Sequence, residues 1–215
     1  MKLFIGWSGE TSGKIAQILA KWLARMFDGH INIVSPTAPI EQIGEYLLVD
    51  VDIDEKMSAA DCGLLCVTED NVNSQGLAYA AGVLSRNAQL VVPLLFHVNV
   101  ASLGAPLLRF EPCWFDFDGM RELLRKLNDL LGKDALPAEE LEESFQARFP
   151  TLEMLVTDTL EESAPQMRED WERNELDEIS AQLAELTKRV ERLKRNISAD
   201  KAPRKPSYRK TSRYM

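Results

Sequence analysis

The stretch DCGLLCVTEDNVNSQGLAYAAGVLSR, residues 61–86, joins an apolar strand to a helix through a polar turn. Residues 62–68 are almost all apolar, as in a strand of a parallel sheet that is covered on both faces. Residues 69–74 are polar and turn-forming, and Ser74 can accept a backbone N–H bond as the cap of the next helix. Residues 75–85 are apolar or small, which predicts a helix buried nearly all round. This unit indicates an α/β fold.

The rest of the first two thirds repeats the alternation of strands and helices, which predicts a doubly wound, flavodoxin-like α/β fold with a five-stranded parallel sheet. Residues 47–61 are ambiguous, because 47–53 alternate like a strand while 54–60 form one or two helical turns. We expect strands at residues 2–6, 31–34, 62–67, 89–95 and 108–114, and helices at 13–27, 75–85 and 120–131.

Three polar loops follow strands of this expected sheet, at residues 7–12, 35–41 and 69–74. Ligands of open parallel sheets bind beyond the carboxyl ends of the strands. We therefore expect the three loops to converge on one crevice. The first loop resembles a nucleotide loop but lacks its first glycine and its magnesium-binding hydroxyl, at Ser8 and Ile15, so a nucleoside triphosphatase is not favoured.

The C-terminal third has a different character. We expect four segments: the α/β domain at 1–135, a helical extension at 136–164, a coiled-coil helix at 165–198 and a basic disordered tail at 199–215. The extension contains two helical patterns, at 139–147 and 152–162. Apolar residues of the coiled-coil segment follow steps of three and four, as in a and d positions of heptads: Leu176, Ile179, Leu183, Leu186, Val190, Leu193 and Ile197.

Such a narrow apolar seam needs a covering partner, because a single helix of ~22 residues is only marginally stable in water. Self-association is the favoured interpretation. Folding back onto the α/β domain and pairing with a different protein remain alternatives.

Composition limits the function classes. The formal net charge of −9 argues against a general nucleic-acid binder. The tail is the exception, because residues 201–215 carry six lysines and arginines and no acid. It is either a solvated end or a segment that contacts nucleic acid or an acidic surface of a neighbouring subunit. The sequence shows neither a membrane-length apolar run nor a secretory signal, which favours a cytoplasmic protein.

The cysteines and histidines do not form a metal signature. Cys62 and Cys66 lie four apart in an expected strand, on one face, and no second pair follows them. Together with Cys113 they are expected to be reduced packing residues. We predict no metal site and no bound cofactor.

Four segments, in order and spacing, resemble the bacterial branch of the Toll/interleukin-1 receptor (TIR) domain family. They are LFIGWSGE (3–10), DCGLLCVTEDN (61–71), NVNSQGLAYAAGVLSR (71–86) and VVPLLFHVNVASLGAPLLRFEP (91–112). The resemblance covers about residues 2 to 155. It implies an enzyme that cleaves NAD⁺ as its substrate, through a glutamate placed directly after the aromatic residue of the third helix.

This chain has Tyr79 as the aromatic residue and Ala80 at the glutamate's position. A tryptophan common in the family just before this point is also missing, with Gly76 near its place. Two accounts of Ala80 stay open, a deliberate inactivating substitution and a naturally degenerate member. Read without the family, Ala80 is one small residue of an apolar helix face with Leu77, Ala81 and Leu84.

The resemblance also implies the remaining site and the biology. The expected substrate-binding residues are Trp7, Ser8, Gly9, Glu10, Ser35, Thr37, Asn73 and Tyr79. A packing role for Trp7 at a strand end is equally expected. The implied activity is that of an NAD⁺ glycohydrolase or cyclase of a prokaryotic antiphage defence system, activated by assembly through the TIR domain and the coiled coil, here inactivated by Ala80. The alternatives are a non-catalytic scaffold or adaptor and a sensor of a nucleotide signal.

Overall fold

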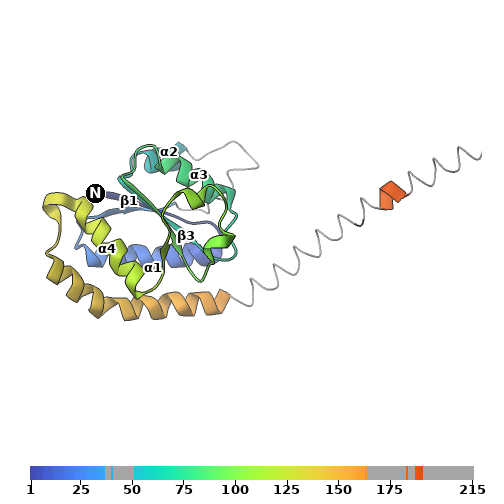
Figure 1. The fold of residues 1–215 in the computed structure, drawn as a ribbon. Helices are drawn as coiled ribbons and strands as arrows, with labels where there is room; N and C mark the ends of the chain where they lie inside the picture. The colour runs from blue at the N-terminus through green and yellow to red at the C-terminus, as the bar shows by residue number, and fades with distance from the viewer. Residues whose placement is uncertain (37–39, 41–50, 164–182, 184–186, 191–215) are drawn as a thin grey trace, which may run out of the picture. The chain divides into compact units, whose positions relative to one another are not determined.

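The computed structural model describes residues 1–36, 40, 51–163, 183 and 187–190. Its centre is a sheet of five parallel strands in the order β2-β1-β3-β4-β5. The strands are β1 (Lys2–Gly6), β2 (Asn32–Val34), β3 (Cys62–Val67), β4 (Leu90–Leu95) and β5 (Cys113–Trp114). Helices cover both faces of the sheet (Figure 1). The predicted doubly wound α/β fold is therefore confirmed.

The first face of the sheet is covered by α1 (Glu10–Met26), α4 (Phe117–Leu131) and a helix of residues 138–163. Side chains of alternate β3 positions, Cys62, Leu64 and Cys66, enter this core. Large aromatic rings fill much of this core. The ring centroids of Phe145 and Phe149 lie 5.1 Å apart, and those of Trp22 and Phe145 lie 6.4 Å apart. This face is thus packed by bulky side chains.

The second face is covered by α2 (Val51–Ser58) and α3 (Gln75–Leu84). The buried residues of α3 include the predicted face, Leu77, Ala80, Ala81 and Leu84. The helix is not buried all round, however, because Gly82 on its outer side is exposed. Ser74 caps α3 as predicted, accepting a bond from the Leu77 N–H at 3.2 Å. Small residues dominate this helix and bring it close to the sheet.

Some element boundaries differ from the predicted ones. Helix α1 begins at Glu10 rather than at residue 13, directly after Gly9, whose φ of +89° is easy for glycine. Residues 51–53, which the sequence left ambiguous, belong to α2, whose Ile53 and Met57 pack on the second core. Residues 47–50 lie outside the described residues.

The predicted fifth strand at 108–114 shrinks to the two residues of β5. Residues before it form a 3₁₀ turn, η3 (Leu107–Arg109), and Pro112, which has no N–H for a strand ladder, directly precedes Cys113. Two further 3₁₀ turns are η2 (Val100–Ser102) and η4 (Gly132–Asp134). Helix α4 begins three residues earlier than predicted, because Asp116 caps it by accepting the Gly119 N–H at 2.7 Å.

The two helical patterns of the extension form one continuous helix, residues 138–163, which passes through Pro150. This helix runs beside α1 in Figure 1, where it is gold to orange. The Trp22 indole donates to the Arg148 carbonyl at 3.2 Å, and Phe149 is buried. Tertiary packing therefore outweighs the local cost of proline.

The chain divides into two compact units, Met1–Pro165 and Gln166–Met215. The extension thus belongs to the unit of the sheet. Of the predicted coiled-coil seam, Leu183 and Val190 are described, lie in helix and are exposed. The other seam residues, Leu176, Ile179, Leu186, Leu193 and Ile197, lie outside the described residues, as does the basic tail. No helix among the described residues has the length and apolarity to cross a membrane.

Candidate functional site

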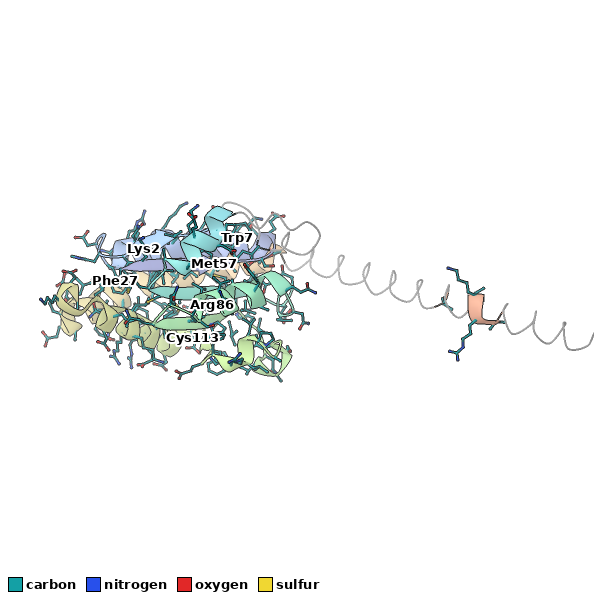
Figure 2. The ribbon with its side chains drawn as sticks, turned by 90° about the horizontal axis from the view of Figure 1, so that it is seen from above. Lys2, Trp7, Phe27, Met57, Arg86 and Cys113 are labelled. Carbon is teal, nitrogen blue, oxygen red and sulfur yellow. The ribbon has the colours of Figure 1, made fainter. Side chains whose placement is uncertain are left out.

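The first two of the three polar loops meet beside the end of β1, where Trp7 follows the strand. Figure 2 labels Lys2 and Trp7 at opposite ends of this strand. The Trp7 indole N–H donates to Ser35 Oγ at 3.1 Å, and Ser35 Oγ donates to the Ile5 carbonyl at 3.1 Å. Ile40 donates its N–H to the Trp7 carbonyl at 3.3 Å. The second loop is therefore bonded to the first at two points.

The third loop joins the first through Ser8. Ser8 Oγ donates to Ser74 Oγ at 2.8 Å, and Ser74 in turn caps α3. Asn71 makes a second link, because its side-chain amide donates to the carbonyls of Ser8 at 2.8 Å and Cys66 at 3.1 Å. Its side-chain oxygen accepts the Thr68 N–H at 2.9 Å. The described residues of the three loops therefore meet through buried polar groups, and the crevice expected among the loops stays a prediction.

We call the hydrogen-bonded residues Trp7, Ser8, Ser35, Asn71 and Ser74 the polar junction. The N-terminus of α1 lies next to it. Gly9 caps the helix without a side-chain bond, and Ser12 Oγ, which is buried, accepts the Ser8 N–H at 3.1 Å. Glu10 is exposed and forms an ion pair with Lys14 at 2.8 Å. The hydrogen bond from Lys14 and its charge lower the pKa of Glu10. Glu10 therefore stays ionised and paired on the surface rather than in a cleft.

Trp7 also fulfils the expected packing role. Its indole carbons lie 2.9 Å from the position of a Cβ built on Gly13, so the ring rests directly on the first turns of α1. The indole covers α1 with one face and bonds Ser35 with its N–H, which ties the first loop to the helix and to the second loop.

Tyr79 links the two helices of the second face. Its hydroxyl donates to both carboxylate oxygens of Asp54 in α2, at 2.9 and 2.8 Å. Burial, and then the hydrogen bond and charge of Asp54, raise the pKa of Tyr79 above its ordinary value of 10.0. The ring is only partly buried, so this pair lies near the surface between α2 and α3.

Ala80, the neighbour of Tyr79, has no exposed surface and belongs to the apolar cluster of the second face. The same cluster contains Ile40 from the second loop. One turn earlier, Gly76 faces the backbone of Ile40, since a Cβ on Gly76 would lie 2.3 Å from the Ile40 carbonyl oxygen. Ile40 therefore lies directly on the small-residue face of α3.

The predicted site residues divide into three groups. Trp7, Ser8, Gly9 and Ser35 lie together at the strand ends, with Ser8 fully buried. Glu10, Asn73, Tyr79 and Ala80 lie around this junction without sharing one surface, because Asn73 and Glu10 are exposed and Ala80 is buried. Thr37 lies outside the described residues.

Sequence reasoning missed two participants, Asn71 and Asp54. Asn71 was part of the recognised turn, and its position directly after the buried strand could have suggested an internal hydrogen-bonding role. Among the described residues, the Thr68 hydroxyl is the buried side-chain oxygen without a hydrogen-bond partner. Nothing in the sequence pattern distinguishes that hydroxyl from an ordinary strand end.

The cysteines behave as packing residues. Cys62 and Cys66 are buried on one face, as their spacing predicts, and all three cysteines are free. Burial raises the pKa of Cys66 to about 12, so its thiol is neither a ready nucleophile nor a ready metal ligand. In the described part of the chain, no three side chains among His, Cys, Asp and Glu cluster as a metal would require.

Comparisons with known proteins do not add a family. No protein-family model matches the chain, and no curated protein matches it.

Proposed function

We propose that this chain is a TIR-type module from a prokaryotic antiphage defence system whose parent activity is the cleavage of NAD⁺ and which does not cleave NAD⁺ as it stands. Ala80 is the observation that carries the proposal, since a buried methyl group occupies the position at which the resemblance implies a catalytic glutamate. On this proposal the protein acts in the cytoplasm and assembles through the α/β domain and the C-terminal seam.

The chemistry of the parent reaction explains the expected loss of activity. Breaking the bond between nicotinamide and ribose passes through a sugar with oxocarbenium character. A carboxylate beside the sugar stabilises its positive charge and accepts hydrogen bonds from its hydroxyls. A methyl group does neither, and removing a group that acts in the transition state lowers turnover while leaving much of substrate binding.

The polar junction supports the proposal that the chain still binds NAD⁺. Trp7, Ser8 and Ser35 lie at the carboxyl ends of parallel strands, where ligands of such sheets bind. The N-terminus of α1 adds backbone N–H groups that favour the phosphates of a dinucleotide. These features agree with a chain that binds NAD⁺ without turnover.

Restoring the carboxylate tests the parent activity. We expect Ala80→Glu to release nicotinamide from NAD⁺, measured by chromatography, while the unaltered chain and Ala80→Gln, of equal size but neutral, remain inactive. Ala78→Glu is the matched control, because Ala78 lies on the same helix with partial exposure. An Ala80→Glu protein that folds and assembles yet leaves NAD⁺ intact would contradict the proposal.

A second candidate, a non-catalytic scaffold or adaptor, is favoured by the contact between Ile40 and Gly76. With Ile40 lying against Gly76 of α3, residue 80 is a core position with no exposed surface, in an apolar cluster that does not suit a charged side chain. Under this function Ala80→Glu loses several kcal/mol of stability as a buried unpaired charge and gains no activity. Thermal melting of Ala80→Glu beside Ala80→Gln and Ala78→Glu distinguishes the two candidates.

Binding assays complete the test. On the parent-activity proposal the unaltered chain binds NAD⁺, and Trp7→Ala together with Ser8→Ala weakens that binding. A scaffold binds neither NAD⁺ nor ADP-ribose, and isothermal titration of both compounds measures the difference.

A further inference from the structure

The helix of residues 138–163 exposes an apolar stripe on the side away from the sheet. Its inner side is buried through residues such as Phe145, Phe149, Leu152 and Val156. On the outer side Met154 and Leu155 are 56% and 43% exposed. Ala147 and Pro150 are exposed as well, and steps of three and four place them in line with Met154. We call Ala147, Pro150, Met154 and Leu155 the outer stripe.

Acidic residues surround the outer stripe. Glu143, Glu153, Asp158 and Glu161 are all exposed on the same helix. Residues 138–163 contain eight acids and one base, Arg148, and the Arg148 guanidinium donates to the Arg25 carbonyl of α1. Within the described part of the chain, the ion pairs of this helix are made by Glu142, which lies outside the stripe. The surface is therefore apolar with an acidic border.

This border determines which partner fits. The same stripe on a second copy brings like charges together, which disfavours pairing of two stripes. A complementary partner needs apolar or aromatic side chains for Met154 and Leu155, and basic side chains for the acids. The sequence of this protein contains such a segment in residues 201–215, with six lysines and arginines, no acid, and the aromatic residues Tyr208 and Tyr214.

We propose that the outer stripe of one copy binds the basic tail, residues 201–215, of a second copy. Tyrosine rings cover the thioether and the leucine, while lysines and arginines neutralise the acidic border. If the apolar seam of residues 176–197 self-associates, as favoured from the sequence, a second copy that pairs there carries its own tail at high local concentration. The tail thereby contributes to assembly.

A labelled peptide of residues 199–215 tests the contact directly. The receptor is the full chain with Lys205→Glu, Arg209→Glu and Lys210→Glu, so that its own tail does not compete. We expect fluorescence anisotropy to show binding that weakens as salt increases. Glu153→Lys with Glu161→Lys in the receptor should weaken binding at least about tenfold, since reversed charges oppose the peptide.

Two matched receptors separate the surface from net charge. Glu122→Lys with Asp129→Lys makes the same change in charge on exposed positions of α4 and should leave peptide binding unchanged. Met154→Ser with Leu155→Ser keeps every charge and should still weaken binding. A peptide carrying the three glutamates should regain binding to the Glu153→Lys, Glu161→Lys receptor. Equal binding to all receptors, or no binding to any, overturns the proposal.

Cross-linking determines which copy supplies the tail. Full-length chains labelled with ¹⁵N are mixed with unlabelled chains and treated with a zero-length carbodiimide reagent. We expect linked peptides of residues 201–215 and 153–161 that pair a labelled with an unlabelled copy. Links confined to one copy overturn the assignment to a second copy. If the peptide binds a DNA oligonucleotide and has the same affinity for every receptor variant, the tail is a nucleic-acid arm, which also overturns the proposal.

Discussion

The two faces of the sheet are packed by opposite means. On the first face, α1, α4 and the helix of residues 138–163 bury large rings, among them Phe145 and Phe149. On the second face, α3 approaches through Gly76, Ala80 and Ala81. A Cβ on Gly76 would meet the Ile40 carbonyl oxygen at 2.3 Å, and one on Gly63 would meet Leu84 Cδ1 at 2.5 Å. The first face therefore depends on large side chains that fill the core. The second depends on small residues that let α3 lie close to its neighbours.

This difference predicts opposite sensitivities. Removing atoms from the first face leaves a cavity, and adding atoms to the second face forces backbone apart. Of the candidate site residues, Tyr79 and Ala80 belong to the second face, whereas Trp7 lies at the strand ends and packs on α1 of the first face. A substitution meant to add chemistry at residue 80 must therefore also fit a surface built for small side chains.

The largest effect is expected from Phe145→Ala. Phe145 is 1% exposed and contacts the rings of Trp22, Phe117 and Phe149, so truncation should lower the free energy of unfolding by about 3–5 kcal/mol. Denaturant unfolding measures the loss. Phe117→Ala is the control, because Phe117 is 40% exposed and should cost clearly less. Equal losses for both would show that the first face does not depend on filled volume.

A smaller loss of stability is expected on the second face, where the control variant should instead gain stability. Gly76→Ala places a methyl group against the Ile40 backbone and should destabilise the fold by about 1–3 kcal/mol. Gly82→Ala lies on the same helix with nothing within 4 Å, and should stabilise it by about 0.5–1 kcal/mol. Thermal melting compares the two variants. A tolerated Gly76→Ala would mean that the second loop yields easily, and that residue 80 can accept a larger side chain.

The two faces also explain what the sequence could predict. Apolar runs and turn residues were sufficient to predict β1, β3, β4 and the cap of α3, because each of these features depends on the local sequence pattern. Tertiary packing decided the rest. Pro150 divides the pattern of residues 138–163, yet the contacts of Trp22 and Phe149 keep the helix continuous. Alternation at residues 47–53 looked like a strand, but α2 begins at Val51.

The candidate site was predictable to the level of its loops. The order of strands and the polar residues after them indicated that Trp7, Ser8 and Ser35 would meet, and they do. The burial of Ala80 was predicted from the apolar helix face that it shares with Leu77 and Leu84. The approach of Ile40 to Gly76 could not be predicted, because the two residues lie far apart in the sequence. Asn71 was missed for a similar reason, since its partner Ser8 comes from the loop after β1 and its partner Cys66 from β3.

A small effect is expected from Tyr79→Phe, which removes the hydrogen bonds between Tyr79 of α3 and Asp54 of α2 with almost no change in side-chain volume. Loss of the bond to Asp54 should cost about 1 kcal/mol at neutral pH, because the pair is partly exposed. Burial and Asp54 raise the pKa of Tyr79 in the folded chain. Its stabilising contribution is therefore complete below the ordinary value of 10.0 and is lost as pH rises through the folded pKa. Melting at pH 8 and pH 11 should show the unaltered chain losing its advantage over Tyr79→Phe at the higher pH. A constant difference at both pH values would mean that Asp54 does not hold the neutral hydroxyl, and that α2 is attached to α3 by apolar contacts alone.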